Sequence, residues 1–116
     1  MASWKTRTSR FPLTRGLVRA ETSFVKRGYA YILRCADGRY YYGSTDNLIR
    51  RLGQHRRGDV RSTHWRLPVE LVFFDEFQTL DQARQREQSF KGGRTRRKKI
   101  ERLIADFPPS RLAPFA

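Results

Sequence analysis

The fold is decided by one stretch, Tyr29–His55, whose sequence is YAYILRCADGRYYYGSTDNLIRRLGQH. Its first half holds two runs rich in aromatic and β-branched residues, 29–35 and 39–44, which are separated by Ala-Asp-Gly at 36–38. A short loop whose glycine tolerates the left-handed conformation, placed between two such runs, is typical of a β-hairpin. The stretch therefore predicts an antiparallel pair of strands.

The length of the hairpin loop sets the register of the two strands. A three-residue loop, a type I turn with a glycine bulge, pairs Tyr31 with Gly43 and places Tyr31 and Tyr41 on one face of the sheet. A two-residue Asp-Gly loop places the two tyrosines on opposite faces. We favour the bulged turn, because Asp37 and Gly38 then occupy the positions that tolerate them best.

A helix is predicted directly after the hairpin, with Thr45 or Asp46 as its N-cap. Its apolar stripe comprises Leu48, Ile49 and Leu52. Arg51 and His55 are four residues apart and share a face of this helix. At roughly 100° per residue they lie at the margin of the apolar stripe, so we expect both to point toward the hairpin.

The remaining chain predicts a third strand and two further helices. Apolar side chains occur at both parities in Val69–Phe74, which indicates a strand covered on both faces. Thr79-Leu80-Asp81-Gln82 has the form of a capping box that opens a helix through Phe90. A last helix is expected from about Thr95 to Phe107, with the packing stripe Ile100, Leu103, Ile104 and Phe107. The fold class is α+β, sandwich-like, with a small three-stranded antiparallel sheet flanked by helices.

Glu87 departs from the pattern of its helix. It falls on the buried face with Ala83 and Phe90, where an apolar side chain is expected. A buried carboxylate is either an ion-pair partner, here of Arg51 or Lys91, or a metal ligand. Spacing alone leaves both interpretations open.

Together these residues resemble the GIY-YIG nucleases, most closely the small single-domain bacterial branch, and are similar to the nuclease domain that makes the first incision in nucleotide excision repair. Tyr29-Ala30-Tyr31 resembles the first tripeptide motif, with Tyr29 in place of its glycine, and Tyr41-Tyr42-Gly43 resembles the second. Arg51 and His55 fall at the family's spacing, and Ala83–Glu87 resembles the helix that bears its metal-ligand glutamate. The resemblance covers about residues 28–105.

This resemblance implies a metal-dependent endonuclease and a role for each residue. Glu87 would hold a Mg²⁺ or Mn²⁺ ion that keeps most of its waters, and Arg51 would clamp the phosphate with its planar guanidinium. Tyr31 would accept the proton of the attacking water, directly or through a relay, while Tyr41 and His55 would orient the water or share that proton. Because a free phenol has a pKa of about 10, the metal and Arg51 would have to lower the pKa of Tyr31.

The charge of the chain predicts a polyanionic partner. The 116 residues carry a net charge of +14, and 20 of the 25 basic residues are arginine, which coding bias would also produce. Residues 1–28 and 81–116 each carry a net +6, whereas residues 29–80 carry +2. Nucleic acid, either DNA or RNA, is the partner that this charge predicts, and an anionic membrane is the weakest alternative. The family resemblance favours DNA over RNA.

Basic residues in three segments, with one tryptophan, are the candidate nucleic-acid contacts. The tryptophan can stack on an unpaired base, although packing on the domain surface explains it equally well. Cations near the start of the last helix oppose its macrodipole, so a phosphate partner explains them better than stability does. The candidates are Arg50, Arg57, Arg61, Trp65, Arg66, Lys91, Arg96, Arg97, Lys98 and Lys99.

The length of the chain predicts one domain, at residues 28–107, with a basic, flexible N-terminal arm at 1–27 and a C-terminal tail at 108–116. One cysteine excludes an internal disulfide, and with two histidines it leaves no zinc constellation. No apolar run approaches the roughly 18 residues of a membrane helix. We expect a bacterial, cytoplasmic, nucleoid-associated protein without a small-molecule cofactor, although the arginine-rich leader also resembles a mitochondrial transit peptide.

The expected function is a DNA endonuclease, structure-selective or nicking, that acts in repair or recombination. One alternative is a catalytically weak nucleic-acid-binding module with the same fold. The other is a basic, RNA-associated structural protein in which these residues are core polar groups. Metal-dependent cleavage separates the first hypothesis from both alternatives, and discrimination between RNA and DNA separates the alternatives from each other.

Overall fold

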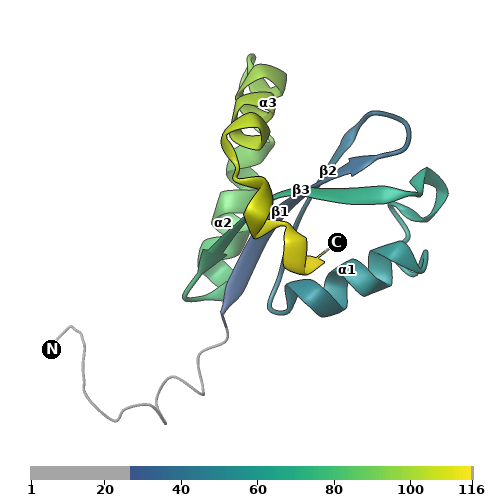
Figure 1. The fold of residues 1–116 in the computed structure, drawn as a ribbon. Coiled ribbons are helices and arrows are strands. Elements are labelled where there is room, and N and C mark those ends of the chain that lie inside the picture. Colours follow the sequence, from purple (N-terminus) through teal and green to yellow (C-terminus); the bar gives the residue numbers. More distant parts are fainter. Residues whose placement is uncertain (1–26, 116) are drawn as a thin grey trace, which may run out of the picture.

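The computed structural model describes residues 27–115, so the arm expected at the N-terminus lies outside the described residues except for Arg27 (Figure 1). Three strands and three α-helices form the domain, with short 3-10 helices between and after them. In chain order they are β1 (Gly28–Cys35), β2 (Tyr40–Thr45), α1 (Leu48–Arg56), η2 (His64–Arg66), β3 (Val69–Phe77), α2 (Leu80–Phe90), α3 (Arg96–Asp106), η3 (Pro109–Arg111) and η4 (Ala113–Phe115).

The sheet is antiparallel throughout, with β1 at its centre in the order β2-β1-β3. At the hairpin turn the Gly38 N–H donates to the Cys35 carbonyl at 2.9 Å, and Gly38 has a φ of 83°. Tyr31 consequently pairs with Gly43. The bulged three-residue turn is confirmed, and Tyr31 and Tyr41 lie on the same face of the sheet.

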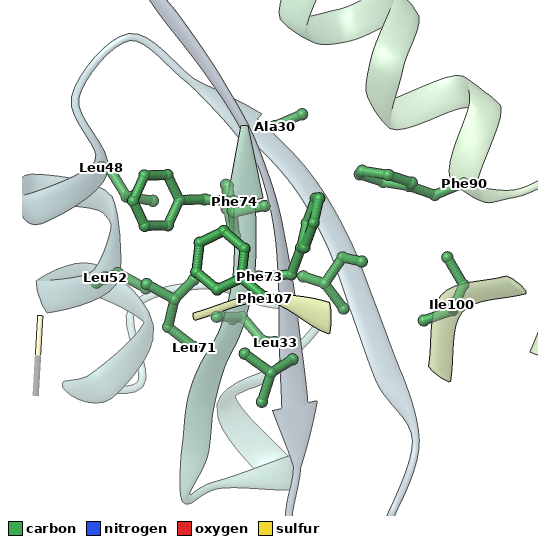
Figure 2. Close-up of a cluster of buried hydrophobic side chains, with 13 residues drawn as sticks. Ala30, Leu33, Leu48, Leu52, Leu71, Phe73, Phe74, Phe90, Ile100 and Phe107 are labelled. Atoms are coloured by element: carbon green, nitrogen blue, oxygen red, sulfur yellow. The ribbon is translucent and has the colours of Figure 1, made fainter. Parts of the chain in front are cut away.

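Helices cover both faces of this sheet, which confirms the α+β prediction (Figure 1). Helix α1 lies on the face that carries Tyr31, and Figure 2 shows its Leu48 and Leu52 directed toward the sheet. On the opposite face, the Phe90 ring of α2 packs against Phe73 of β3, with 5.9 Å between ring centroids. The core therefore has two halves, and the candidate site belongs to the α1 half.

Local signals placed most elements correctly. Leu71–Phe74 of β3 are all buried, as expected of a strand covered on both faces. At the start of α2 the Thr79 hydroxyl accepts from the Gln82 N–H at 3.1 Å, and the Gln82 side chain accepts from the Thr79 N–H at 3.3 Å. The predicted capping box is confirmed.

Two expectations for α1 are wrong. Asn47, rather than Thr45 or Asp46, is the N-cap, because its extended backbone lets its side chain accept from the Arg50 N–H at 3.0 Å. The Thr45 hydroxyl instead accepts from the Asn47 N–H at 3.1 Å, which fixes the bend before the helix. Ile49 is 69% exposed and does not belong to the buried stripe, which is completed by His55.

The segment expected as a tail packs on the core. The Arg111 guanidinium lies 4.8 Å from the Phe74 ring and 5.0 Å from the Phe107 ring, and Phe115 packs on Phe74 with 5.1 Å between centroids. The C-terminal residues thus cross from the α3 side of the sheet to α1 (Figure 1). Within the described part of the chain, no helix has the length and apolar character required to cross a bilayer.

Candidate active site

A buried chain of three polar side chains forms the centre of the site. The Tyr31 hydroxyl lies 2.9 Å from Nε2 of His55, and Nδ1 of His55 lies 2.9 Å from the Thr63 hydroxyl. All three side chains are fully buried. Because both ring nitrogens have a partner, the imidazole is held in one orientation, and either neutral tautomer satisfies both contacts.

Tyr41 and Arg51 complete this cluster from β2 and α1. The Tyr41 ring lies 5.0 Å from the His55 ring and 6.2 Å from the Tyr31 ring, centroid to centroid. The Arg51 guanidinium interacts with both phenol hydroxyls, and its Nη1 donates to the Gln54 side chain at 2.9 Å. The four residues predicted to be catalytic are therefore in contact, whatever their chemical roles.

Burial changes the protonation of the cluster. It lowers the pKa of His55 to about 4, with a smaller contribution from the nearby charge of Arg51. Burial also raises the pKa of Tyr31, and Tyr41 adds to this shift while Arg51 opposes it. At neutral pH the cluster thus holds a neutral imidazole and a protonated phenol, and Arg51 alone does not make Tyr31 a strong base.

The depressed pKa of His55 predicts a stability that depends on pH. An unfolded histidine has a pKa of about 6.5, so the unfolded state binds a proton that the folded state excludes between pH 6.5 and the folded value of about 4. Stability therefore falls as the pH drops through this window, by about 3 kcal/mol when the window is complete. Urea unfolding measured across the range should show this loss in the wild type.

His55→Gln is the matched variant, because glutamine keeps a donor and an acceptor but does not titrate. The difference in unfolding free energy between wild type and variant should shrink as the pH falls from about 7 to about 4. Carboxylates titrate equally in both proteins and cancel in this difference. Parallel pH profiles for the two proteins would contradict the assignment.

Glu87 extends from α2 to β2, the edge strand that also carries Tyr41. Its side chain is 16% exposed; one carboxylate oxygen accepts from the Ser44 hydroxyl at 2.7 Å, and the other accepts from Nζ of Lys91 at 2.8 Å. The negative charge of Glu87 also raises the pKa of Tyr31, so the carboxylate and the buried cluster are electrostatically coupled. Of the two ion pairs considered from spacing, the pair with Lys91 is formed.

The surroundings of Glu87 fit a cation held by a single protein ligand. Among residues 27–115, no three His, Cys, Asp or Glu side chains come together as a metal-binding group. Each carboxylate oxygen accepts one hydrogen bond and keeps a lone pair free. The Lys91 side chain is 43% exposed, so its ion pair with Glu87 is weak enough to be exchanged. Mg²⁺ commonly binds through one carboxylate while it keeps several waters.

An open cleft of about 390 Å³ gives access to this edge. Ser44 and Arg51 line it, together with Gln54 from α1 and Arg84 from α2. Arg50 lines it as well and forms an ion pair with Asp46 at 2.7 Å. A phosphate in this cleft would meet the Arg51 guanidinium before it reached the buried tyrosine and histidine.

The remaining nucleic-acid candidates lie in two other places. At the C-cap of α1, in the turn that follows and in η2 are Arg57, Arg61, Trp65 and Arg66. Trp65 is 67% exposed, but the Arg66 side chain is only 12% exposed and pairs with Asp37 at 3.1 Å. On α3 and the turn before it are Lys91, Arg96, Arg97, Lys98 and Lys99, all exposed. The ten candidates therefore do not share one cleft.

Two polar contacts of the site, Thr63 and Ser44, were missed from the sequence. Thr63 lies in the irregular segment between α1 and β3, where no periodicity predicts which side chain turns inward. For Ser44 a signal existed. Its side chain has the same strand parity as Tyr42, so it must project on the α2 face, toward the helix that carries Glu87.

Comparison with known proteins agrees with the geometry. The chain matches the GIY-YIG catalytic domain over residues 27–101. It belongs to this family. GIY-YIG domains are in general endonucleases, so membership indicates a nuclease and a nucleic-acid substrate. The matched region contains both tyrosine motifs, Arg51, His55 and Glu87.

Two relatives and one solved structure that resemble this GIY-YIG protein carry the name UPF0213, which states no activity. A UPF0213 protein of Natronomonas pharaonis is 43% identical over 79 residues, which cover 67% of this chain and 91% of the relative. A UPF0213 protein of Pediococcus pentosaceus is 40% identical over 84 residues, covering 72% and 87% respectively. The solution NMR structure of a UPF0213 protein from Bacillus halodurans is 32% identical and superposes with a TM-score of 0.44, covering 66% of this chain and 84% of that one.

Proposed function

We propose that this protein is a metal-dependent endonuclease that hydrolyses phosphodiester bonds in DNA, as a structure-selective or nicking enzyme of repair or recombination. The supporting observation is the contact of Tyr31, His55, Tyr41 and Arg51 in one cluster, next to the carboxylate of Glu87. Together they offer a phosphate clamp, a path for a proton and a cation ligand, which phosphodiester hydrolysis requires.

Arg51 is the residue that receives the phosphate. It lies at the boundary between the open cleft and the buried cluster, and the Gln54 side chain holds its guanidinium in place. A planar guanidinium binds two phosphate oxygens at once, which fixes the orientation of the scissile bond. Glu87 would hold Mg²⁺ or Mn²⁺, which supplies neutralisation of the phosphate charge.

Tyr31 and His55 would move the proton of the attacking water as a pair. In the tautomer in which Nδ1–H of His55 donates to Thr63, the Tyr31 hydroxyl donates to Nε2. Tyr31 can then accept the proton of the water while it passes its own proton to Nε2. This relay avoids a free phenolate, which burial disfavours. A phosphate at Arg51 offsets the positive charge that lowers the pKa of His55 and so strengthens the imidazole as a base.

Cleavage by the purified protein of a panel of DNA and RNA structures, with and without Mg²⁺, tests the proposal. Arg51→Ala should reduce the cleavage rate by about 100- to 1,000-fold, the usual loss when one stabilising donor at an oxyanion is removed. Arg50→Ala is the matched control: it removes a neighbouring cleft arginine that is already paired with Asp46. Its effect should be confined to binding affinity.

The outcome also decides between the alternatives. Tight binding without metal-dependent cleavage would favour the nucleic-acid-binding module, an interpretation consistent with the protonated Tyr31 and the Glu87–Lys91 ion pair. A clear preference for RNA over DNA without cleavage would favour the RNA-associated structural protein. Equal cleavage by the Arg51 and Arg50 variants would remove Arg51 from the mechanism.

A further inference from the structure

A second, larger groove of about 800 Å³ lies on the α2 side of β2. The edge strand contributes Tyr40 and Tyr42, which share a parity opposite to that of Tyr41. Five cations also line it, from the residue before β2, the α2–α3 turn and the start of α3, and none of the groove residues within 27–115 is acidic. The buried cluster at Tyr31 uses none of these side chains.

The two tyrosines form stacking platforms. Tyr40 and Tyr42 are partly exposed and lie two residues apart on one strand, which separates them by about 7 Å. The Arg97 guanidinium lies 4.7 Å from the centroid of the Tyr40 ring, and the Phe90 ring supports Tyr42 with 5.9 Å between centroids. Aromatic rings combined with a basic groove are the usual elements that bind single strands without sequence preference.

The groove cations of α3 make long, exposed contacts with the backbone: Arg96 donates to the Lys91 carbonyl at 3.2 Å, and Arg97 donates to the Gly38 carbonyl at 3.4 Å. Helix α3 begins with the run Arg96–Lys99 and has no acidic residue in its first turn. Positive charges there repel one another and oppose the helix macrodipole. Arg97 has a partner in Glu101 at 3.1 Å, but this ion pair is exposed and weak. The negative phosphates of a polyanion in the groove would offset this repulsion, and the release of its condensed counterions would also favour binding.

Lys91 connects the groove to the candidate site. Its side chain lines the groove and at the same time donates to Glu87, whose other oxygen accepts from Ser44. Ser44 in turn lines the cleft at Arg51. A strand whose phosphate binds at Arg51 can therefore continue past Glu87 into the groove.

We propose that this groove binds an unpaired stretch of the substrate strand next to the scissile phosphate, which makes a junction between paired and unpaired nucleic acid the substrate class. The inference rests on the proposed nuclease function. The tyrosines favour unpaired bases, because the faces of bases inside a duplex are already stacked. Exposed tyrosines would therefore add little to duplex binding. Phosphate contacts alone would need only the cations.

Fluorescence anisotropy in EDTA tests this inference without cleavage. The probes are a labelled blunt DNA duplex and a duplex with a single-stranded extension, matched in their number of phosphates. The wild type should prefer the extended duplex, and Tyr40→Leu should reduce that preference by about 10-fold, since stacking on one aromatic ring contributes that order of affinity. Tyr42→Leu should act similarly, with its melting temperature measured because Tyr42 packs on Phe90.

Tyr40→Phe keeps the ring and should keep the preference. Arg96→Ala should weaken binding to the extended duplex more than to the blunt duplex, and should reduce the salt slope of the extended duplex by about one. Equal wild-type affinity for the two probes, or equal losses on both probes in the Tyr40→Leu variant, would overturn the inference and make the groove a duplex phosphate site. Because binding is measured without metal, a junction preference in a protein that does not cleave would leave the groove assignment intact while the nuclease proposal fails.

Discussion

Glu87→Gln is expected to reduce cleavage by about 1,000-fold or more while folding and nucleic-acid binding stay nearly intact. The substitution keeps the shape of the side chain but removes the charge that a divalent cation needs, and charge neutralisation at phosphate contributes several kcal/mol. The amide can accept from Lys91 through its oxygen and donate to the Ser44 hydroxyl through its nitrogen, so both contacts survive. Loss of the exposed ion pair with Lys91 should cost at most about 1 kcal/mol.

Three measurements test this prediction: the cleavage rate, the melting temperature and the Mn²⁺ affinity from calorimetric titration. Glu70→Gln is the matched control, because Glu70 forms a surface ion pair with Arg34 and stands outside the site. The control should keep the cleavage rate and the Mn²⁺ affinity of the wild type. A Glu87 variant that melts markedly earlier, yet cuts with normal Mg²⁺ dependence below its melting temperature, would show that Glu87 is a structural ion-pair partner.

The parts of the fold that could be predicted from the sequence are those that local chemistry determines. The hairpin register follows from the turn, because Asp37 and Gly38 fit only certain positions of a bulged loop. The start of α2 follows from two reciprocal hydrogen bonds between Thr79 and Gln82. Strand parity then placed Tyr31 and Tyr41 on one face before any tertiary contact was known.

The errors arise where distant segments decide the local outcome. Ile49 has the spacing of a core residue, but the inward position one turn after Leu52 belongs to His55. Thr63 and Tyr31, both outside the helix, satisfy its two ring nitrogens. The packing of Phe115 on Phe74 joins residues 41 positions apart in sequence and carries no local signal. Long-range contacts of this kind override propensity and spacing.

The candidate site shows the same division. Residue types and spacing selected Tyr31, Tyr41, Arg51, His55 and Glu87, because the family resemblance rests on them. Their protonation was not predictable, because burial rather than Arg51 dominates the pKa of Tyr31. Whether Glu87 is free or paired was also undecided from spacing, since the outcome depends on where β2 places Ser44 and where the α2 terminus places Lys91.

Gly43→Ala adds a single methyl group to the site, and we expect it to destabilise the protein strongly. The Tyr31 ring crosses directly over Gly43, and a Cβ there would lie 2.5 Å from both Cζ and the hydroxyl oxygen of Tyr31. The ring would have to move, which breaks its hydrogen bond to His55. Overpacking costs about 1–3 kcal/mol and an orphaned buried polar group about as much again. We expect a loss of about 3 kcal/mol and a melting temperature lower by roughly 10–20 °C.

The proposed relay also predicts that Gly43→Ala loses cleavage below its melting temperature, because Tyr31 and Nε2 of His55 no longer meet. Gly92→Ala is the matched control, since a Cβ at Gly92 meets no atom within 4 Å, and it should leave both stability and cleavage unchanged. A double-mutant cycle with Tyr31→Leu identifies the cause. If the displaced ring is responsible, Gly43→Ala should cost little in the Tyr31→Leu background. An equal loss of unfolding free energy in both backgrounds would mean that the backbone of the edge strand, and not the Tyr31 ring, requires glycine at this position.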